Sequence, residues 1–347
     1  MIKNSQGLSS RQQSKTHRMK RCFSSVLFGM VISNTAHALV INATFDSSWL
    51  TNAPASATTA INVVDSMLGT LYSNPVTVNI NFGWNSIAGT PLATNSLGAT
   101  TFNNAPLYTL GYIESLMTAY SASHPSNTVM SSVVSHLPVS VSNPGGSNGF
   151  FLPEAVYAAL TDISVGATNA YVGFGGGFNW QYTQTGGIAA GAYDFVGVAL
   201  HEITHALGRV SYEFVAPNTP FLTPLDLVRY NCGSTTLNST SGSTACFSIN
   251  GGITDLAVFS PTSDSADLNG ATIDPFNAFM SSGTTYTMTS LGNQMMQSVG
   301  WTLSTAVPEP GTVYLIGVSF IAMIVARRRK MRPGSGHPAW GAIGRSV

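Results

Sequence analysis

Two histidines and a glutamate stand together near the middle of this 347-residue chain, in the segment HEITH. His201 and His205 are four residues apart, so on an α-helix their imidazoles lie one turn apart on the same face. Two imidazole nitrogens at that spacing can hold one Zn²⁺ ion and leave a coordination position open for water. Glu202 projects beside them, where its carboxylate can take a proton from that water. The pattern therefore predicts a hydrolytic zinc centre.

The helix that must carry these residues is predicted from its two ends. Asp194 suits an N-cap, Gly208 suits a C-terminal cap, and the thirteen residues between them contain no proline. Helical geometry places four aliphatic residues on one stripe and the histidines with Glu202 on the other side; the four are Val196, Leu200, Ile203 and Leu207. A chance HExxH in this composition is expected about two times in a thousand. The alternative is a structural pair of histidines.

The stretch HEITHALGR resembles the zincin superfamily of metalloproteases, and Gly208 matches the metzincin pattern HExxHxxGxxH. The resemblance ends at the third metzincin ligand, because Ser211 stands there and is a poor zinc ligand. Thermolysin-like zincins take an acidic ligand further along the chain. That resemblance implies Asp226, 21 residues beyond His205, as the third ligand, with Glu213 as the alternative.

The segment 224–230 (PLDLVRY) adds to this resemblance, because bacterial PEP-CTERM proteins of the zincin type combine a HEIT helix with a PLDL-RY segment. Arg209 and Arg229 lie in these two segments, and we expect each to form a structural ion pair with a carboxylate. Tyr212 and Tyr230 are candidates for donating a hydrogen bond to the tetrahedral oxyanion.

Periodicity in the rest of the chain predicts a mixture of helices and strands. Helices are expected over residues 60–72, 107–120 and from Pro153 onward, and strands over 76–82 and 170–174. The strand at 170–174 either forms a sheet edge that pairs with an extended peptide or packs in the core. The expected fold is α+β, a zincin-like metalloprotease domain over residues 39–304 with a twisted mixed sheet and the HExxH helix. Asp264, Asp267 and Asp274 form a weaker candidate for a Ca²⁺ site.

Charge divides the chain into three parts. Six of its Lys and Arg precede residue 22 and six follow residue 326, whereas residues 39–306 carry two Arg against thirteen acidic side chains, a net charge of −11. A body this acidic argues against a nucleic-acid partner.

The two basic ends have the features of export signals. At the start, the basic segment RMKR, an apolar run and the small-residue site Ala36-His37-Ala38 predict a signal peptide over residues 1–38, to be removed by signal peptidase. At the other end, Pro308-Glu309-Pro310, an apolar segment at 312–326 and the cluster RRRK resemble the PEP-CTERM sorting tail of Gram-negative bacteria, here residues 305–332. That resemblance implies a transient anchor in the inner membrane, cleavage by an exosortase and release to the cell surface or extracellular space. A plain membrane anchor is the alternative, and residues 333–347 form a short extension.

Cysteine usage agrees with an exported protein. Only Cys232 and Cys246 remain after signal-peptide removal, and an even pair in an oxidising compartment predicts a disulfide. Two buried thiols are the alternative. The sequence thus predicts a secreted zinc-dependent endopeptidase with one catalytic Zn²⁺ and a protein or peptide substrate. A non-catalytic surface or matrix protein on a zincin scaffold, or a zinc hydrolase of a non-peptide substrate, is the alternative.

Overall fold

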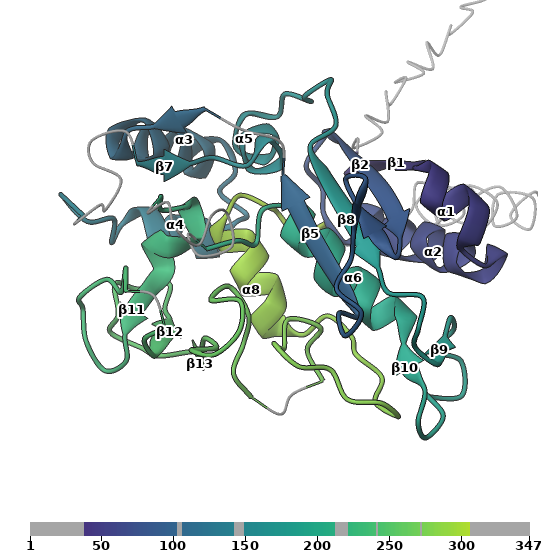
Figure 1. Cartoon of the computed structure of the whole chain (residues 1–347). Coiled ribbons are helices and arrows are strands. Elements are labelled where there is room, and N and C mark those ends of the chain that lie inside the picture. Colours follow the sequence, from purple (N-terminus) through teal and green to yellow (C-terminus); the bar gives the residue numbers. More distant parts are fainter. Residues whose placement is uncertain are drawn as a thin grey trace, which may run out of the picture. The chain divides into compact units, whose positions relative to one another are not determined.

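Four strands form the largest sheet of the protein (Figure 1), whose computed structural model describes residues 38–102, 106–141, 149–211, 221–240, 242–270 and 273–305. They are β1 (Val40–Phe45), β2 (Thr77–Trp84), β8 (Ala170–Phe174) and β5 (Gly98–Phe102), paired in the order β1-β2-β8-β5. The first three run parallel, and β5 pairs antiparallel with β8. In this sheet β5 is therefore an edge strand, and β8 lies inside.

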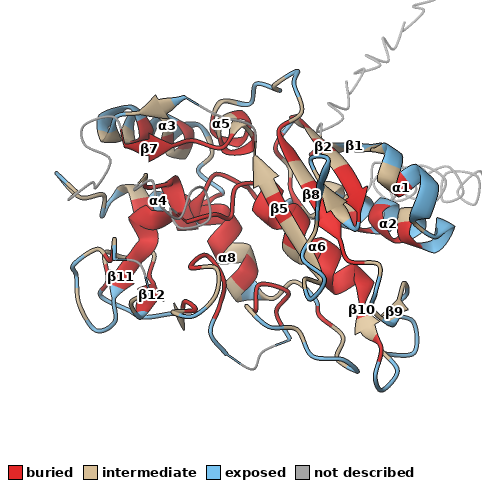
Figure 2. Ribbon diagram, viewed as in Figure 1, coloured by how far each residue is buried: buried red, intermediate tan, exposed pale blue. Residues whose placement is uncertain are grey.

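Alternation along the strands creates one buried face. In β2 the side chains of Val78, Ile80 and Phe82 are buried, and the residues between them are partly exposed. Helix α6 (Phe195–Ala206) contacts β5 and β8 and also packs against α2 (Ala55–Leu71). Figure 2 shows α6 buried along almost its whole length. Helix α6, which carries the predicted metal ligands, thus packs between the sheet and α2.

The other elements connect and surround these. They are α1 (Ser47–Asn52), β3 (Ser86–Ile87), β4 (Thr90–Pro91), β6 (Leu107–Tyr108), α3 (Leu110–Ser123), α4 (Thr128–Val134), β7 (Phe150–Phe151), α5 (Glu154–Thr161), β9 (Trp180–Gln181), β10 (Tyr193–Asp194), the 3-10 helix η2 (Pro224–Val228), β11 (Arg229–Asn231), β12 (Ala245–Phe247), β13 (Ala257–Val258) and α8 (Ser290–Ser298). Strands β11, β12 and β13 form a small antiparallel sheet. The described residues belong to one compact unit.

Most predicted elements are confirmed, with shifted ends. The strand at 170–174 is β8, and of its two predicted alternatives core packing is the one found, because β5 pairs with it and takes the edge of the sheet. The helix predicted at 107–120 is α3, which begins three residues later because Leu107 and Tyr108 pair with β7. Helices, strands and a mixed sheet are all present, and assignment to the zincin fold stays a prediction.

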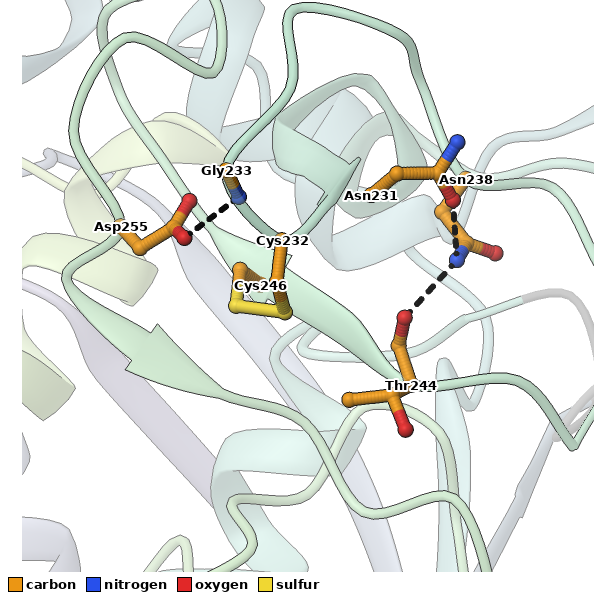
Figure 3. Close-up of a disulfide and its surroundings, with 7 residues drawn as sticks. All are labelled: Asn231, Cys232, Gly233, Asn238, Thr244, Cys246 and Asp255. Atoms are coloured by element: carbon orange, nitrogen blue, oxygen red, sulfur yellow. Dashed lines mark hydrogen bonds between the residues drawn. A yellow bond between two sulfur atoms is a disulfide. The ribbon is translucent and has the colours of Figure 1, made fainter.

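The predicted disulfide is present. Cys232 and Cys246 are joined by an S–S bond of 2.02 Å, and their Cα atoms are 5.0 Å apart (Figure 3). Beside it the backbone N–H of Gly233 donates to the carboxylate of Asp255 at 2.7 Å. The bond joins the end of β11 to β12, so it constrains the small sheet.

The predicted export signals fall outside the described residues. This holds for residues 1–37, for the motif Pro308-Glu309-Pro310, for the apolar segment 312–326 and for the extension at 333–347. Within the described ranges, no helix has the length and apolar character that crossing a membrane requires.

Candidate metal centre

Helix α6 is fixed at both ends by its surroundings. Gly208 has a φ of +104°, and a Cβ atom at this position would lie 2.0 Å from Cγ2 of Val156, so only glycine fits where the chain leaves the helix. Asp194 is the N-cap residue, as predicted, but its side chain makes no cap bond. Its carboxylate instead accepts hydrogen bonds from the Gln184 side chain at 2.7 Å and from the Tyr286 backbone N–H at 2.9 Å.

Both histidines of α6 are oriented through their Nδ1 atoms. Nδ1 of His201 lies 2.7 Å from the carbonyl oxygen of Pro275, and Nδ1 of His205 lies 2.6 Å from that of Arg209. A carbonyl only accepts, so each Nδ1 carries the proton and each Nε2 presents a lone pair. The two Nε2 atoms lie 3.0 Å apart. A hydrogen bond from the second ring nitrogen to a backbone carbonyl is typical of metal-binding histidines.

A carboxylate from a distant loop completes this cluster. Oδ1 of Asp267 lies 3.5 Å from Nε2 of His201 and 3.2 Å from Nε2 of His205. The three side chains form a compact group of metal-ligating atoms in the described part of the chain. Asp267 is held there by the fully buried Arg209, whose Nη1 donates to the same Oδ1 at 2.7 Å and to the Ala266 carbonyl at 3.0 Å.

The two histidines do not supply positive charge to balance the Asp267 carboxylate. Burial lowers the pKa of His201 to about 3 and also lowers the pKa of His205, so both rings are neutral near pH 7. Burial alone would raise the pKa of Asp267, but the two histidines and Arg209 hold it below its ordinary value. Two nitrogen lone pairs and a carboxylate oxygen therefore face one another without a proton between them, and a cation is the natural partner for all three.

The charges nearby indicate a divalent cation. Asp264 is a further carboxylate here: its Oδ2 is buried, has no hydrogen-bond partner among the described residues, and lies 3.9 Å from Nε2 of His205. Burial and the adjacent Asp267 raise the pKa of Asp264 well above its ordinary value. If Glu202, Asp264 and Asp267 are all ionised, they exceed Arg209 by two negative charges. Two imidazoles, carboxylates and this charge fit Zn²⁺.

Glu202 lies beside the histidines under the edge strand. Its side chain is buried, and its Oε2 accepts a hydrogen bond from the hydroxyl of Thr100 at 2.8 Å. Burial raises the pKa of Glu202 to about 8, and this hydrogen bond acts in the opposite direction. A divalent cation nearby would favour the ionised form, the one that can act as a base.

A cavity of about 640 Å³ opens onto these groups. One wall is formed by residues 95–99, which lead into β5, and another by residues 277–280. Phe178 and Tyr193 add aromatic surface, and His201, Glu202, His205, Asp264 and Asp267 all line the cavity. The candidate ligands are therefore accessible to a molecule larger than water.

Asp226, predicted from the zincin resemblance as the third ligand, does not belong to this cluster. Its carboxylate accepts from the Thr223 backbone N–H at 2.7 Å and from Nη1 of Arg229 at 3.1 Å. Asp226 therefore caps η2, a role compatible with its place after Thr223 and Pro224. The structure puts Asp267 at the histidines instead. Glu213, the alternative third ligand, lies outside the described residues.

Of the two predicted oxyanion donors, Tyr230 does not line this cavity. Tyr230 is buried, and its hydroxyl donates to the Leu227 carbonyl at 3.4 Å. Tyr212 lies outside the described residues. Tyr193 does line the cavity, and it was missed because nothing in its local sequence marks it.

The suggested calcium site is also not assembled. Asp264 and Asp267 lie at the histidines, whereas Asp274 accepts hydrogen bonds from Thr289 and from the Gly292 backbone N–H at the start of α8. Asp267 was predicted as part of that calcium site and not as a partner of the two histidines. It stands 62 residues beyond His205, and no local pattern links the two. The expected ion pairs of Arg209 and Arg229 are both confirmed.

Comparison with known proteins identifies one feature of the chain. Residues 306–330 match the description "PEP-CTERM protein-sorting motif". The motif indicates an exported protein of a Gram-negative bacterium that is processed by an exosortase, as the sorting tail predicted. No curated protein and no solved structure matches the chain.

Proposed function

We propose that this protein is an exported zinc-dependent endopeptidase. The observation that carries the proposal is the convergence of His201, His205 and Asp267 in a cavity beside Glu202. Two imidazoles, a carboxylate and a neighbouring acid on one cavity wall are what metal-assisted hydrolysis requires. The sorting motif is consistent with an extracytoplasmic site of action.

Three residues of the chain would hold the metal. Nε2 of His201 and Nε2 of His205 supply the nitrogen ligands, and the Asp267 carboxylate supplies oxygen. When bound, zinc supplies a Lewis acid that polarises the scissile carbonyl and lowers the pKa of a water molecule. Arg209 keeps Asp267 ionised and in place.

Glu202 would act as the proton carrier. Its carboxylate takes the proton of the attacking water as the water oxygen adds to the amide carbon, and then gives that proton to the leaving nitrogen. The amide bond breaks without a covalent enzyme intermediate. Burial of Glu202 excludes bulk water from competing for the carboxylate.

Edge strand β5 offers the substrate a place to bind. Among the described residues no strand pairs with its outer side, and the segment 95–99 at its start lines the cavity. An extended peptide can pair with the backbone of such an edge, which is a common mode of peptide recognition. This favours a peptide substrate over a small ester or amide.

The export route follows from the sorting tail. We propose that signal peptidase removes residues 1–38, and that the tail anchors the chain in the inner membrane until an exosortase cleaves it. The product is then at the cell surface or outside the cell.

A peptide-library digest with two controls tests the function. The purified full-length protein in detergent should cleave internal peptide bonds, lose activity on chelation, and regain it when one equivalent of Zn²⁺ is returned. Glu202→Gln should retain the zinc and lose about 100- to 10,000-fold in kcat. Zinc bound without peptide cleavage would favour the non-catalytic scaffold or a hydrolase of another substrate class.

A further inference from the structure

The edge strand β5 contacts Glu202 at two positions. Gly98 and Thr100 are two residues apart, so they face the same side of the strand. The Thr100 hydroxyl lies 2.8 Å from Oε2 of Glu202, and a Cβ atom at Gly98 would lie 2.7 Å from both Cγ and Oε1. The two segments are separated by about a hundred residues in sequence, so this contact is a product of the tertiary fold.

Thr100 anchors one oxygen of the carboxylate. Its hydroxyl has a single proton and two acceptors within reach, Oε2 at 2.8 Å and the backbone carbonyl of Glu202 at 2.9 Å. When Glu202 is ionised, the carboxylate oxygen is the stronger acceptor. A bond to Oε2 fixes the plane of the carboxylate and leaves Oε1 to take a proton from water.

Gly98 provides the space that this orientation needs. The side chain of Glu202 occupies the volume in which a Cβ atom of residue 98 would stand. Gly98 does not have a positive φ, so its backbone conformation would accept alanine. The three atoms nearest to such a methyl group all belong to Glu202, so the substitution would push the Glu202 carboxylate away.

We propose that Thr100 and Gly98 are positioning residues for the general base Glu202. This inference rests on the proposed peptidase function and deepens it. Strand β5, which we propose pairs with the substrate, then also orients the general base Glu202. Peptide binding and the orientation of Glu202 therefore depend on the same strand.

The test compares three threonine variants of the purified, zinc-loaded full-length protein. Thr100→Val removes the hydroxyl and should lower kcat about 10- to 100-fold, with KM and zinc content unchanged. Thr100→Ser keeps the hydroxyl and should restore most of the loss. Thr77→Val makes the same change in β2, outside the lining of the cavity, and should leave kcat unaltered. A Thr100→Val enzyme with wild-type kcat, or with a raised KM alone, would overturn the proposal.

Gly98→Ala and crystal structures separate this inference from the proposed function. Gly98→Ala should lower kcat without loss of zinc. In crystals, the Glu202 carboxylate should leave its position in Thr100→Val and Gly98→Ala but keep it in Thr100→Ser. This readout needs no activity, so it decides the inference even if the wild-type protein cleaves no peptide. An unmoved carboxylate in both disruptive variants would contradict it.

Discussion

The protein contains two buried aspartate–arginine pairs with almost the same chemistry and different surroundings. Arg209 donates to Asp267 at 2.7 Å, and Arg229 donates to Asp226 at 3.1 Å. Each guanidinium also lies over a phenylalanine ring, at 4.2 Å from Phe276 and 5.2 Å from Phe259. The remaining neighbours differ: Asp267 faces two imidazoles, whereas Asp226 accepts hydrogen bonds from the backbone N–H and the hydroxyl of Thr223 at the start of η2.

This difference explains why one pair is a candidate site and the other is structural. A buried carboxylate with an arginine partner is neutralised, so the pair alone needs no ligand. Asp267 shares its cavity with Glu202 and Asp264, and when all three are ionised the charge of Arg209 balances only one of them. Asp226 has backbone and hydroxyl donors that satisfy it.

Asparagine substitutions of the two aspartates should distinguish the two pairs most clearly. In Asp267→Asn the affinity for Zn²⁺ should fall more than about 100-fold, because a charged ligand is lost. This exceeds the usual effect of mutating a residue that only hydrogen-bonds to a metal ligand. Competition with a chelator measures it. Peptidase activity should fall with the metal. Unchanged zinc affinity in this variant would remove Asp267 from the centre.

The matched variant Asp226→Asn should lower the stability of the protein and leave zinc binding unchanged. Arg229 would keep its buried charge without a carboxylate partner, which costs about 3–5 kcal/mol of unfolding free energy. Denaturant unfolding in the presence of a chelator gives this number. Zinc affinity, measured on the folded protein, should remain at the wild-type value; a selective loss of metal would restore Asp226 as the ligand.

Asp264→Asn tests the charge balance at the cavity. Removing one of three carboxylates should weaken Zn²⁺ binding by about 10- to 100-fold. The metal-free protein should become more stable, since burial and Asp267 both disfavour the Asp264 charge. Chelator competition and thermal unfolding without metal provide the two readouts. A less stable metal-free variant would mean that Asp264 has a structural partner.

The local part of the site could be predicted from the sequence. On an α-helix the spacing alone places His201 and His205 one turn apart, and Gly208 is a sufficient signal for the end of that helix. The PEP-CTERM tail is equally local, since its motif, apolar segment and basic cluster are contiguous.

Asp267 and Thr100 could not be predicted in this way. Their positions depend on how the loop after β13 and strand β5 fold onto α6, and such non-local pairing leaves no periodic signal. The same limit explains why the sequence left open whether the strand at 170–174 lies at the edge or in the core, because strand order is set by which segments pair and not by the pattern within one strand. Asp226 was favoured because it lies 21 residues beyond His205, near the offset of the acidic ligand in the zincins that the sequence resembles.

Asp65 of α2 extends the comparison to a buried carboxylate without an arginine. Its Oδ1 has no hydrogen-bond partner among the described residues, and burial raises its pKa to about 7. Because the pKa of Asp65 is higher in the folded protein than the unfolded value of 3.8, ionisation of Asp65 destabilises the fold. This loss of unfolding free energy grows as the pH rises from about 4 to 7 and is constant above that. Asp65→Asn should therefore stabilise the protein by about 1–2 kcal/mol at pH 8, allowing for its partial exposure, and by almost nothing at pH 4. Unfolding curves at the two pH values check this; an equal gain at both would show that ionisation is not the cause.

Anomalous diffraction at the zinc edge from crystals of the zinc-loaded protein tests the central claim most directly. We predict one strong peak within about 2.0–2.2 Å of Nε2 of His201, Nε2 of His205 and a carboxylate oxygen of Asp267. A peak elsewhere, or none between the two imidazoles, would contradict the assignment of a metal centre to α6.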